Sequence, residues 1–340
     1  MVEASKDSID LVVEELKGHT DEVNCLAVLE DAEFMGRPTT LMVSASEDQY
    51  VRLWDMRMKT SVKRYGCPQF KDSAPTNVAF SPCGTEIYAT SDANFLTFDV
   101  RTDSILISEP KLTRTVNADE INQIHINPAN GLIGLPDDNG DIHLLSTSEE
   151  NKHLAALERG HKNICNTVFV TNKTDVFTAG FDCKILKWNR EKCKVKQELD
   201  MVELFSTLGS STTINPPHVY SLDFNQRFGK LLVALGNGSI VALTPSKLDV
   251  PSHCLDAHQD KVVQARYAGW NFKTAISISS DQTMAFWNLG KNGVESFVKP
   301  NQYLIRRYQL DNKPNWVAPS QNGIFVADTS NKISYFTLKG

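Results

Sequence analysis

The chain has 340 residues, 41% of them hydrophobic and 22% charged, and its formal net charge is −6 at pH 7. This composition is that of a folded protein, and the negative charge argues against a surface built mainly for nucleic acid. No apolar run approaches the roughly 20 residues that a membrane-spanning helix needs.

The N-terminal end and the cysteines together predict a location. Residues 1–10 are polar and acidic, which predicts that no signal peptide is present. The seven cysteines follow no framework of spacings, which predicts free thiols in a reducing compartment. We therefore expect a cytoplasmic or nuclear protein.

Short β-rich runs separated by turns follow one another along the sequence, mostly in groups of four. After a run at 9–16, the expected runs are 23–28, 41–46, 51–55 and 61–65; 76–80, 86–90, 95–99 and 105–107; 121–126, 132–135, 141–145 and 153–157; 164–170, 176–179, 184–188 and 194–199; 219–224, 230–234, 239–243 and 253–255; 262–267, 274–278, 283–287 and a poorly defined run within 294–307; and 315–317, 323–327 and 332–337. Residues 30–39 interrupt the first group as an insertion, and residues 201–217 form a long connection rich in Ser and Thr.

The grouping predicts a closed ring. Seven groups of about 48 residues each match the blades of a propeller, and the last group has only three runs. Because the run 9–16 belongs to no other group, we predict that it supplies the missing outer strand and closes the ring. Residues 1–340 then form one domain. A count of six units is the alternative, since groups five and seven are weakly marked.

A polar pattern recurs in three of the groups. A Ser or Thr is followed four residues later by Asp and six residues after that by Trp, and a His lies some tens of residues upstream. The three sets are His19, Ser44, Asp48 and Trp54; His161, Thr178, Asp182 and Trp188; and His258, Ser277, Asp281 and Trp287. A pattern that returns once per supersecondary unit indicates a repeat architecture.

These sets resemble those of the WD-repeat β-propeller family. The resemblance implies an all-β, seven-bladed propeller in which the four side chains form a hydrogen-bonded network that ties the strands of a blade together. Ser, His and Asp are also the parts of a nucleophilic triad, but three copies favour a structural role, since an enzyme needs one. We expect no catalytic residue, no metal and no cofactor, because neither C-x-x-C pairs nor nucleotide-binding motifs occur.

Residues 42–57 carry a second resemblance. They are similar to a box found in substrate receptors of cullin-four ubiquitin ligases, whose signature is Trp-Asp-x-Arg, here Trp54, Asp55 and Arg57. The second blade repeats a degenerate form with Phe98, Asp99 and Arg101. The resemblance implies that Arg57 and Arg101 lie side by side on one face and dock the ligase adaptor, the large subunit of the damaged-DNA-binding protein. The alternative is that each Arg only neutralises the neighbouring Asp.

Further runs resemble one group of WD-repeat proteins proposed as such receptors. These runs are 119–122, 137–140, 161–165, 215–216, 315–316, 326–328 and 333–334. The sequence departs from the group in the insertion 30–39, in the complete set of blade one and in lacking a long basic segment before Asn315.

Two further segments are candidate surfaces. Residues 201–217 mix Ser and Thr with Leu204, Phe205, Leu208 and Ile214, which fits either a recognition loop or a spacer packed on its own blade. A basic set on blade one is expected to be a solvated edge that could steer an acidic partner. Its members are Arg52, Arg57, Lys59, Lys63 and Arg64.

The leading hypothesis is a non-enzymatic protein-binding scaffold, monomeric within a larger complex, that serves as a substrate-recognition subunit of a cullin-four RING ligase. The rival is a WD-repeat scaffold of a nuclear or cytoplasmic complex unrelated to ubiquitin. An enzyme with a site in the central channel would need convergent titratable groups, and the sequence shows no such set. Neither nucleic acid nor membrane is an expected partner.

Overall fold

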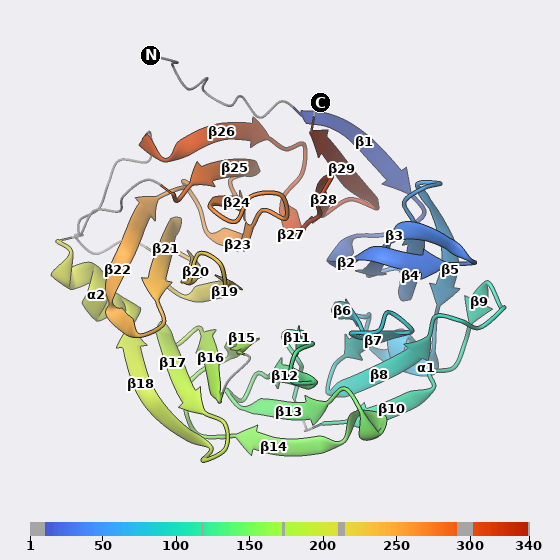
Figure 1. Cartoon of the computed structure of the whole chain (residues 1–340), viewed down its shortest axis with the longest axis horizontal. Helices are drawn as coiled ribbons and strands as arrows, with labels where there is room; N and C mark the ends of the chain where they lie inside the picture. Colours follow the sequence, from blue (N-terminus) through green and yellow to red (C-terminus); the bar gives the residue numbers. More distant parts are fainter. Residues whose placement is uncertain (1–10, 117–118, 172–173, 210–214, 291–301, 339–340) are drawn as a thin grey trace.

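Seven small sheets stand side by side in a ring around a central channel (Figure 1). The structure is a computed structural model and describes residues 11–116, 119–171, 174–209, 215–290 and 302–338. In each sheet one strand lies at the channel and the others follow outward to the rim. The predicted seven-bladed propeller is confirmed, and the alternative of six blades is wrong.

Blades one to three hold the first part of the sequence. Their strands are β2 (Val23–Phe34), β3 (Arg37–Ser46), β4 (Tyr50–Asp55) and β5 (Thr60–Tyr65); β6 (Asn77–Phe80), β7 (Glu86–Ser91), β8 (Asn94–Asp99) and β10 (Leu112–Thr115); and β11 (His125–Asn127), β12 (Leu132–Pro136), β13 (Ile142–Ser146) and β14 (His153–Leu157). A five-residue helix, α1 (Pro68–Asp72), enters blade two, and a 3₁₀ turn, η1 (Glu149–Asn151), precedes β14.

Blades four to seven complete the ring. Their strands are β15 (Cys165–Val170), β16 (Asp175–Gly180), β17 (Lys184–Asn189) and β18 (Lys194–Asp200); β19 (Val219–Asn225), β20 (Lys230–Leu235), β21 (Ser239–Thr244) and β22 (Lys247–Asp256); β23 (Val262–Tyr267), β24 (Thr274–Ser279), β25 (Thr283–Asn288) and β26 (Leu304–Gln309); and β27 (Pro314–Pro319), β28 (Gly323–Asp328), β29 (Lys332–Leu338) and β1 (Leu11–Lys17). Of the poorly defined run, residues 294–301 lie outside the described residues.

The first and last strands meet in blade seven. β1 pairs antiparallel with β29 over seven residue pairs, from Leu11 with Leu338 to Lys17 with Lys332. The buried side chain of Leu16 joins a core shared with blade one, and Lys59 of blade one forms an ion pair with Glu14 at 2.5 Å. The predicted closure by the N-terminal run is thus confirmed; its first two residues, 9 and 10, lie outside the described residues.

The outer strand of blade two differs from the prediction. Residues 105–107 do not join that blade: β9 (Leu106–Ile107) pairs in parallel with β5, and the fourth strand of blade two is β10. Arg64 and Gly66 donate their backbone amides to the carbonyls of Ile105 and Ile107, both at 2.8 Å. The Ile-Leu-Ile run predicted a strand correctly, but it satisfies the outer edge of blade one. The polar run Leu-Thr-Arg-Thr of β10 gave a weaker strand signal.

The insertion in blade one extends a hairpin. β2 and β3 continue through residues 30–39 as paired strands, and Met35 and Gly36 form the tip with φ of 53° and 72°. Glycine adopts such a positive φ without steric cost, which suits the second tip position. The insertion is therefore not a loose loop but a projection of the sheet.

The connection between blades four and five begins as a helix. α2 (Met201–Thr207) follows directly on β18, and its N-cap Asp200 accepts hydrogen bonds from the amides of Val202 and Glu203. The predicted long loop is thus wrong over these residues. An acidic N-cap followed three residues later by Glu is a helix-start signal that the sequence contained. Neither α1 nor α2 is long enough to cross a membrane, and the described residues include no other α-helix.

Side chains of one blade stitch its inner strand to the next blade. Because each inner strand is the edge of its sheet, its backbone groups toward the next blade need partners. Near the start of the strand, Asn amides donate to a backbone carbonyl of the following blade: Asn24 to Pro75, Asn77 to Ile121, Asn122 to Cys165, Asn166 to Tyr220 and Asn315 to Val23. One residue further, side-chain acceptors receive a backbone N–H: Cys25 from Val78, Gln123 from Val168, Thr167 from Leu222, Ser221 from Ala265 and Gln264 from Val317. These contacts line the channel with polar groups.

Candidate functional site

The set of blade four forms a continuous series of hydrogen bonds. His161 Nδ1 lies 3.0 Å from Asp182, and its Nε2 lies 2.7 Å from the hydroxyl of Thr178. The indole Nε1–H of Trp188 donates to that hydroxyl at 2.9 Å. With Nδ1–H donated to the carboxylate, Nε2 accepts the hydroxyl proton. Every member is then satisfied by a neutral imidazole, which is the condition under which a buried network rigidifies its surroundings.

Blade one repeats this arrangement. His19 contacts Asp48 and Ser44, both at 2.7 Å, and Trp54 donates to Ser44 at 2.8 Å. Burial lowers the pKa of His19, whereas the hydrogen bond from His19 holds the pKa of Asp48 low despite the partial burial of that carboxylate. The imidazole is therefore kept neutral in the folded protein.

Blade six adds one residue to the pattern. His258 Nε2 lies 2.7 Å from Ser277, which also accepts from Trp287 at 2.8 Å. Nδ1 lies 2.8 Å from the hydroxyl of Thr283, which in turn donates to Asp281 at 2.6 Å. The Asp281 carboxylate also lies 3.3 Å from Nδ1, so the imidazole contacts it both directly and through this hydroxyl.

These sets have triad-like geometry without a reachable nucleophile. The hydroxyls of Ser44, Thr178 and Ser277 belong to fully buried residues, and each already accepts a Trp indole N–H. A substrate carbonyl has no path to them, and a nucleophile must approach the atom it attacks. Among the described residues, no group of three or more His, Cys, Asp or Glu is placed to hold a metal ion.

The Trp-Asp-x-Arg residues of blade one form a rigid turn after β4. The Arg57 guanidinium contacts Asp55 through Nε and Nη2, and the Arg57 amide donates to the same carboxylate at 3.1 Å. Thr39, from the inserted hairpin, donates its hydroxyl to Asp55 at 2.7 Å. The hydrogen bonds from Arg57 hold the pKa of Asp55 below its usual value. Thr39 is a member of this site that the sequence did not reveal.

Blade two repeats the turn with more exposure. Arg101 contacts Asp99 through Nε at 3.0 Å and Nη2 at 2.7 Å. The Arg101 side chain is 65% exposed, against 31% for Arg57. A guanidinium has five N–H donors, and a side-on pair of this kind uses two of them, so Nη1 and half of Nη2 stay available. By accepting two hydrogen bonds, each Asp fixes the plane of the guanidinium and thus the direction of its remaining N–H groups.

The aromatic residues of the predicted adaptor-binding motif do not lie on the protein surface. Trp54 and Phe98 are completely buried, so they place the turns but cannot touch a partner. Asp48 lies before β4 and Arg57 after it, and six residues at about 3.3 Å each separate the two ends of the strand. The Asp-x-Arg turns therefore lie on the face opposite the His-bearing loops.

The basic set of blade one is only partly solvated: Arg57 and Lys59 are exposed, whereas Arg52, Lys63 and Arg64 are partly buried. The prediction of a solvated edge therefore holds for the first two members only, and most of the set has partners. Besides Arg57, Lys59 pairs with Glu14, and Arg64 lies over the ring of Tyr50 at 4.4 Å. Lys63 Nζ donates to the Val100 carbonyl at 2.6 Å and to that of Thr102. Arg52 is largely buried, 4.0 Å from Asp48. Lys63 thus fastens the Arg101 turn of blade two to blade one.

The described residues of the connection, 201–209 and 215–217, bury most of their apolar side chains, although Val202 is exposed. Leu204 and Phe205 are buried, and Leu208 packs against the same core as these two. Ile214 lies outside the described residues. Of the two interpretations, the described part favours a spacer packed on its own blades over a recognition loop.

Comparisons with known proteins agree with the architecture. The family model described as WD domain, G-beta repeat matches residues 11–55. The chain is 24% identical over 360 residues to the WD repeat-containing protein 53 homolog of Dictyostelium discoideum, covering 97% of this chain and 95% of the relative. This match confirms the resemblance to WD repeat-containing protein 53 over nearly the whole chain.

Proposed function

We propose that this seven-bladed WD-repeat β-propeller is a non-enzymatic substrate-recognition subunit of a cullin-four RING ubiquitin ligase. WD-repeat propellers are interaction folds, so protein partners are expected. The proposal extends this to one adaptor, the large subunit of the damaged-DNA-binding protein. It includes a cytoplasmic or nuclear location and a propeller that is monomeric within its complex.

The observation that supports the adaptor is the pair of Asp-x-Arg turns in consecutive blades. Both turns follow the third strand of their blade, and in both the Asp holds the guanidinium by two hydrogen bonds. Lys63 ties the second turn to the first blade. Two fixed guanidinium groups on one face suit paired hydrogen bonds to carboxylates or carbonyls of one partner.

The local alternative is that each Arg exists to neutralise its Asp. The contacts with Asp55 and Asp99 are present, so this alternative describes part of what the residues do. It does not use the outer N–H donors of either guanidinium. Docking and neutralisation therefore differ in one respect only, namely whether a partner depends on these donors.

A pull-down with the purified adaptor subunit separates them. We expect the double variant Arg57→Ala, Arg101→Ala to lose at least ten-fold in adaptor affinity, since charge-assisted hydrogen bonds each contribute about 1.5–3 kcal/mol. The matched control is Arg190→Ala, because Arg190 follows Trp188 at the corresponding turn of blade four. Full adaptor binding by a folded double variant would defeat the proposal. Binding by the wild type to other proteins but never to the adaptor would favour the rival, a scaffold unrelated to ubiquitin.

A further inference from the structure

The mouth of the central channel holds a cavity of about 240 Å³. Its wall comes from all seven blades, from their inner strands or from the residues that lead into them, and it includes the stitching residues Asn24, Asn166 and Asn315. Asn24 and Asn166 follow the His-bearing loops of blades one and four, so the cavity opens on the face opposite Arg57 and Arg101. Any ligand here is independent of adaptor docking.

One cation lines this cavity without an ionic partner. Arg266, on β23 of blade six, donates Nη1 to the Leu222 carbonyl at 3.1 Å, and its guanidinium lies 5.6 Å from the centre of the Trp316 ring. No carboxylate among the described residues comes within 4.0 Å of it. The described residues thus leave four of its five N–H donors without a hydrogen-bond acceptor.

The nearby titratable groups do not compensate this charge by contact. Asp223 accepts the backbone amide of Tyr267 at 2.7 Å, and burial raises the pKa of Asp223 although Arg266 acts in the opposite direction. Burial lowers the pKa of His125 to about 3, so this imidazole is neutral. A partly desolvated charge is costly unless it is paired, which makes Arg266 a site that a counter-charge would stabilise.

Charge is unevenly distributed around the mouth. On the side of blades one to three, burial and the carboxylates of Asp138, Asp92 and Glu47 raise the pKa of Glu120. On the side of blades five and six, Lys261 lies over the ring of Tyr220 at 5.2 Å, and burial together with the neighbouring Asp260 carboxylate raises the pKa of Tyr220. The guanidinium of Arg266 in the cavity wall therefore attracts a single negative charge, whereas the carboxylates around the mouth disfavour anions of higher charge. A singly charged carboxylate fits this balance better than a phosphate dianion.

We infer that the channel mouth is a binding site for a carboxylate, which pairs with the free N–H groups of Arg266 between blades five and seven. The carboxylate comes from a protein partner, either from an Asp or Glu side group or from the partner's C-terminal residue. A planar carboxylate can accept two hydrogen bonds from one guanidinium, which gives the site its specificity. The face that carries the His loops then recognises one acidic group at its centre.

Peptide titrations at constant ionic strength test this site. The probes are acetyl-Gly-Glu-Gly-amide, the same peptide with Gln, acetyl-Gly-Gly-Gly with a free carboxylate, and inorganic phosphate. The readout is tryptophan fluorescence, because Trp316 lies against Arg266. We expect saturable binding of at least one carboxylate peptide, weaker binding of the Gln peptide and of phosphate, and at least a ten-fold loss in Arg266→Gln. Which carboxylate peptide binds identifies the source.

Two further variants keep the test decisive. Arg227→Gln removes an exposed arginine outside the cavity and should bind like the wild type. Val263→Glu places a carboxylate in the cavity wall without touching a hydrogen bond of Arg266, and it should block the site even if Arg266→Gln does not fold. Equal binding of the Glu and Gln peptides, preference for phosphate, or full affinity in Val263→Glu would overturn the inference.

Discussion

Blades four and two hold their strands together in different ways, the first with side-chain hydrogen bonds and the second with apolar packing. Blade four joins its strands through the hydrogen bonds that run from Trp188 through Thr178 and His161 to Asp182. Blade two has Tyr88 where the hydroxyl residue stands and Phe98 where the Trp stands, and no His precedes it at the corresponding place. Both blades nevertheless have four paired strands. The His, Ser or Thr, Asp and Trp set is therefore one way to hold the strands of a blade together, and the fold does not require it in every blade.

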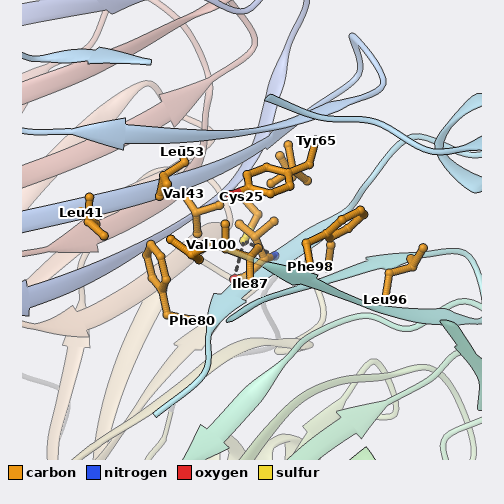
Figure 2. Packing of buried hydrophobic residues seen from close by; sticks show 14 of the residues in the cluster. Cys25, Leu41, Val43, Leu53, Tyr65, Phe80, Ile87, Leu96, Phe98 and Val100 are labelled. Carbon is orange, nitrogen blue, oxygen red and sulfur yellow. Dashed lines mark hydrogen bonds between the residues drawn. The ribbon is translucent and has the colours of Figure 1, made fainter. Parts of the chain in front are cut away.

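In blade two, a short helix takes the place of the missing His loop. α1 inserts Phe70, which is fully buried, 5.9 Å from the ring of Phe98, and Tyr65 of blade one lies 5.3 Å from the same ring. Figure 2 shows Tyr65 and Phe98 converging within this cluster. Ser91 fixes the helix by donating its hydroxyl to the carbonyls of Ser73 and Gln69. In blade two, the packing of aromatic side chains thus takes the role that hydrogen bonds have in blade four. The stability of the two blades should therefore be sensitive to different substitutions.

The largest expected effect is in blade two. Phe70→Ala should lower the free energy of unfolding by about 3–5 kcal/mol, because it leaves a cavity beneath Phe98 that the five-residue helix cannot fill. Chemical denaturation monitored by circular dichroism measures the change. Phe272→Ala, at a ring that is 37% exposed, is the control and should cost far less. A loss below about 1 kcal/mol for Phe70→Ala would show that α1 does not hold blade two.

A smaller effect is expected in blade four. His161→Ala should cost about 1–3 kcal/mol, because it leaves Asp182 and the Thr178 hydroxyl without their partner in a buried place. Thr178→Val conserves shape and should cost less in the His161→Ala background than in the wild type, since the two residues are coupled. Melting curves of the two single variants and the double variant measure this. An unchanged melting temperature for His161→Ala would break the comparison, since the polar network would then stabilise nothing.

The difference between the two blades also explains what the sequence could reveal. The polar set can be recognised because its members keep fixed spacings of four and six residues along adjacent strands, and the indole must reach the hydroxyl across that register. Closure by Phe70 has no such spacing: a five-residue helix shows no periodicity, and the buried ring packs on a residue distant in the sequence, Phe98. Sequence reasoning therefore located the four strands of blade four and misplaced the outer strand of blade two.

In the candidate sites too, features that are local in the sequence could be predicted, whereas those that depend on distant residues could not. The Asp-x-Arg turns could be predicted because motif and turn are local in the sequence. The roles of three other residues could not be predicted, because each depends on a contact with a residue more than ten positions away. Thr39 contacts Asp55, Lys63 contacts Val100, and Arg266 contacts Trp316. A single Arg in a β-run carries no sequence signal that it will lack an ionic partner.

The smallest expected effect is a pH dependence of the melting temperature. It distinguishes the hydrogen-bonded His sets from the apolar Phe70 cluster while both are still present in the protein. In the unfolded state His has a pKa of about 6.5, whereas burial lowers the pKa of His19 and His258 in the folded protein. The unfolded state therefore binds more protons as pH falls through about 6.5, and stability is lost in that direction. We expect the melting temperature to fall between pH 7.5 and 5.5, roughly one unit on either side of that value, and His19→Gln combined with His258→Gln to reduce that fall. Phe70→Ala should lower the melting temperature by a similar amount at both pH values, because no group in its cluster titrates there. An equally steep fall in the double His variant would place the titrating groups outside the polar sets.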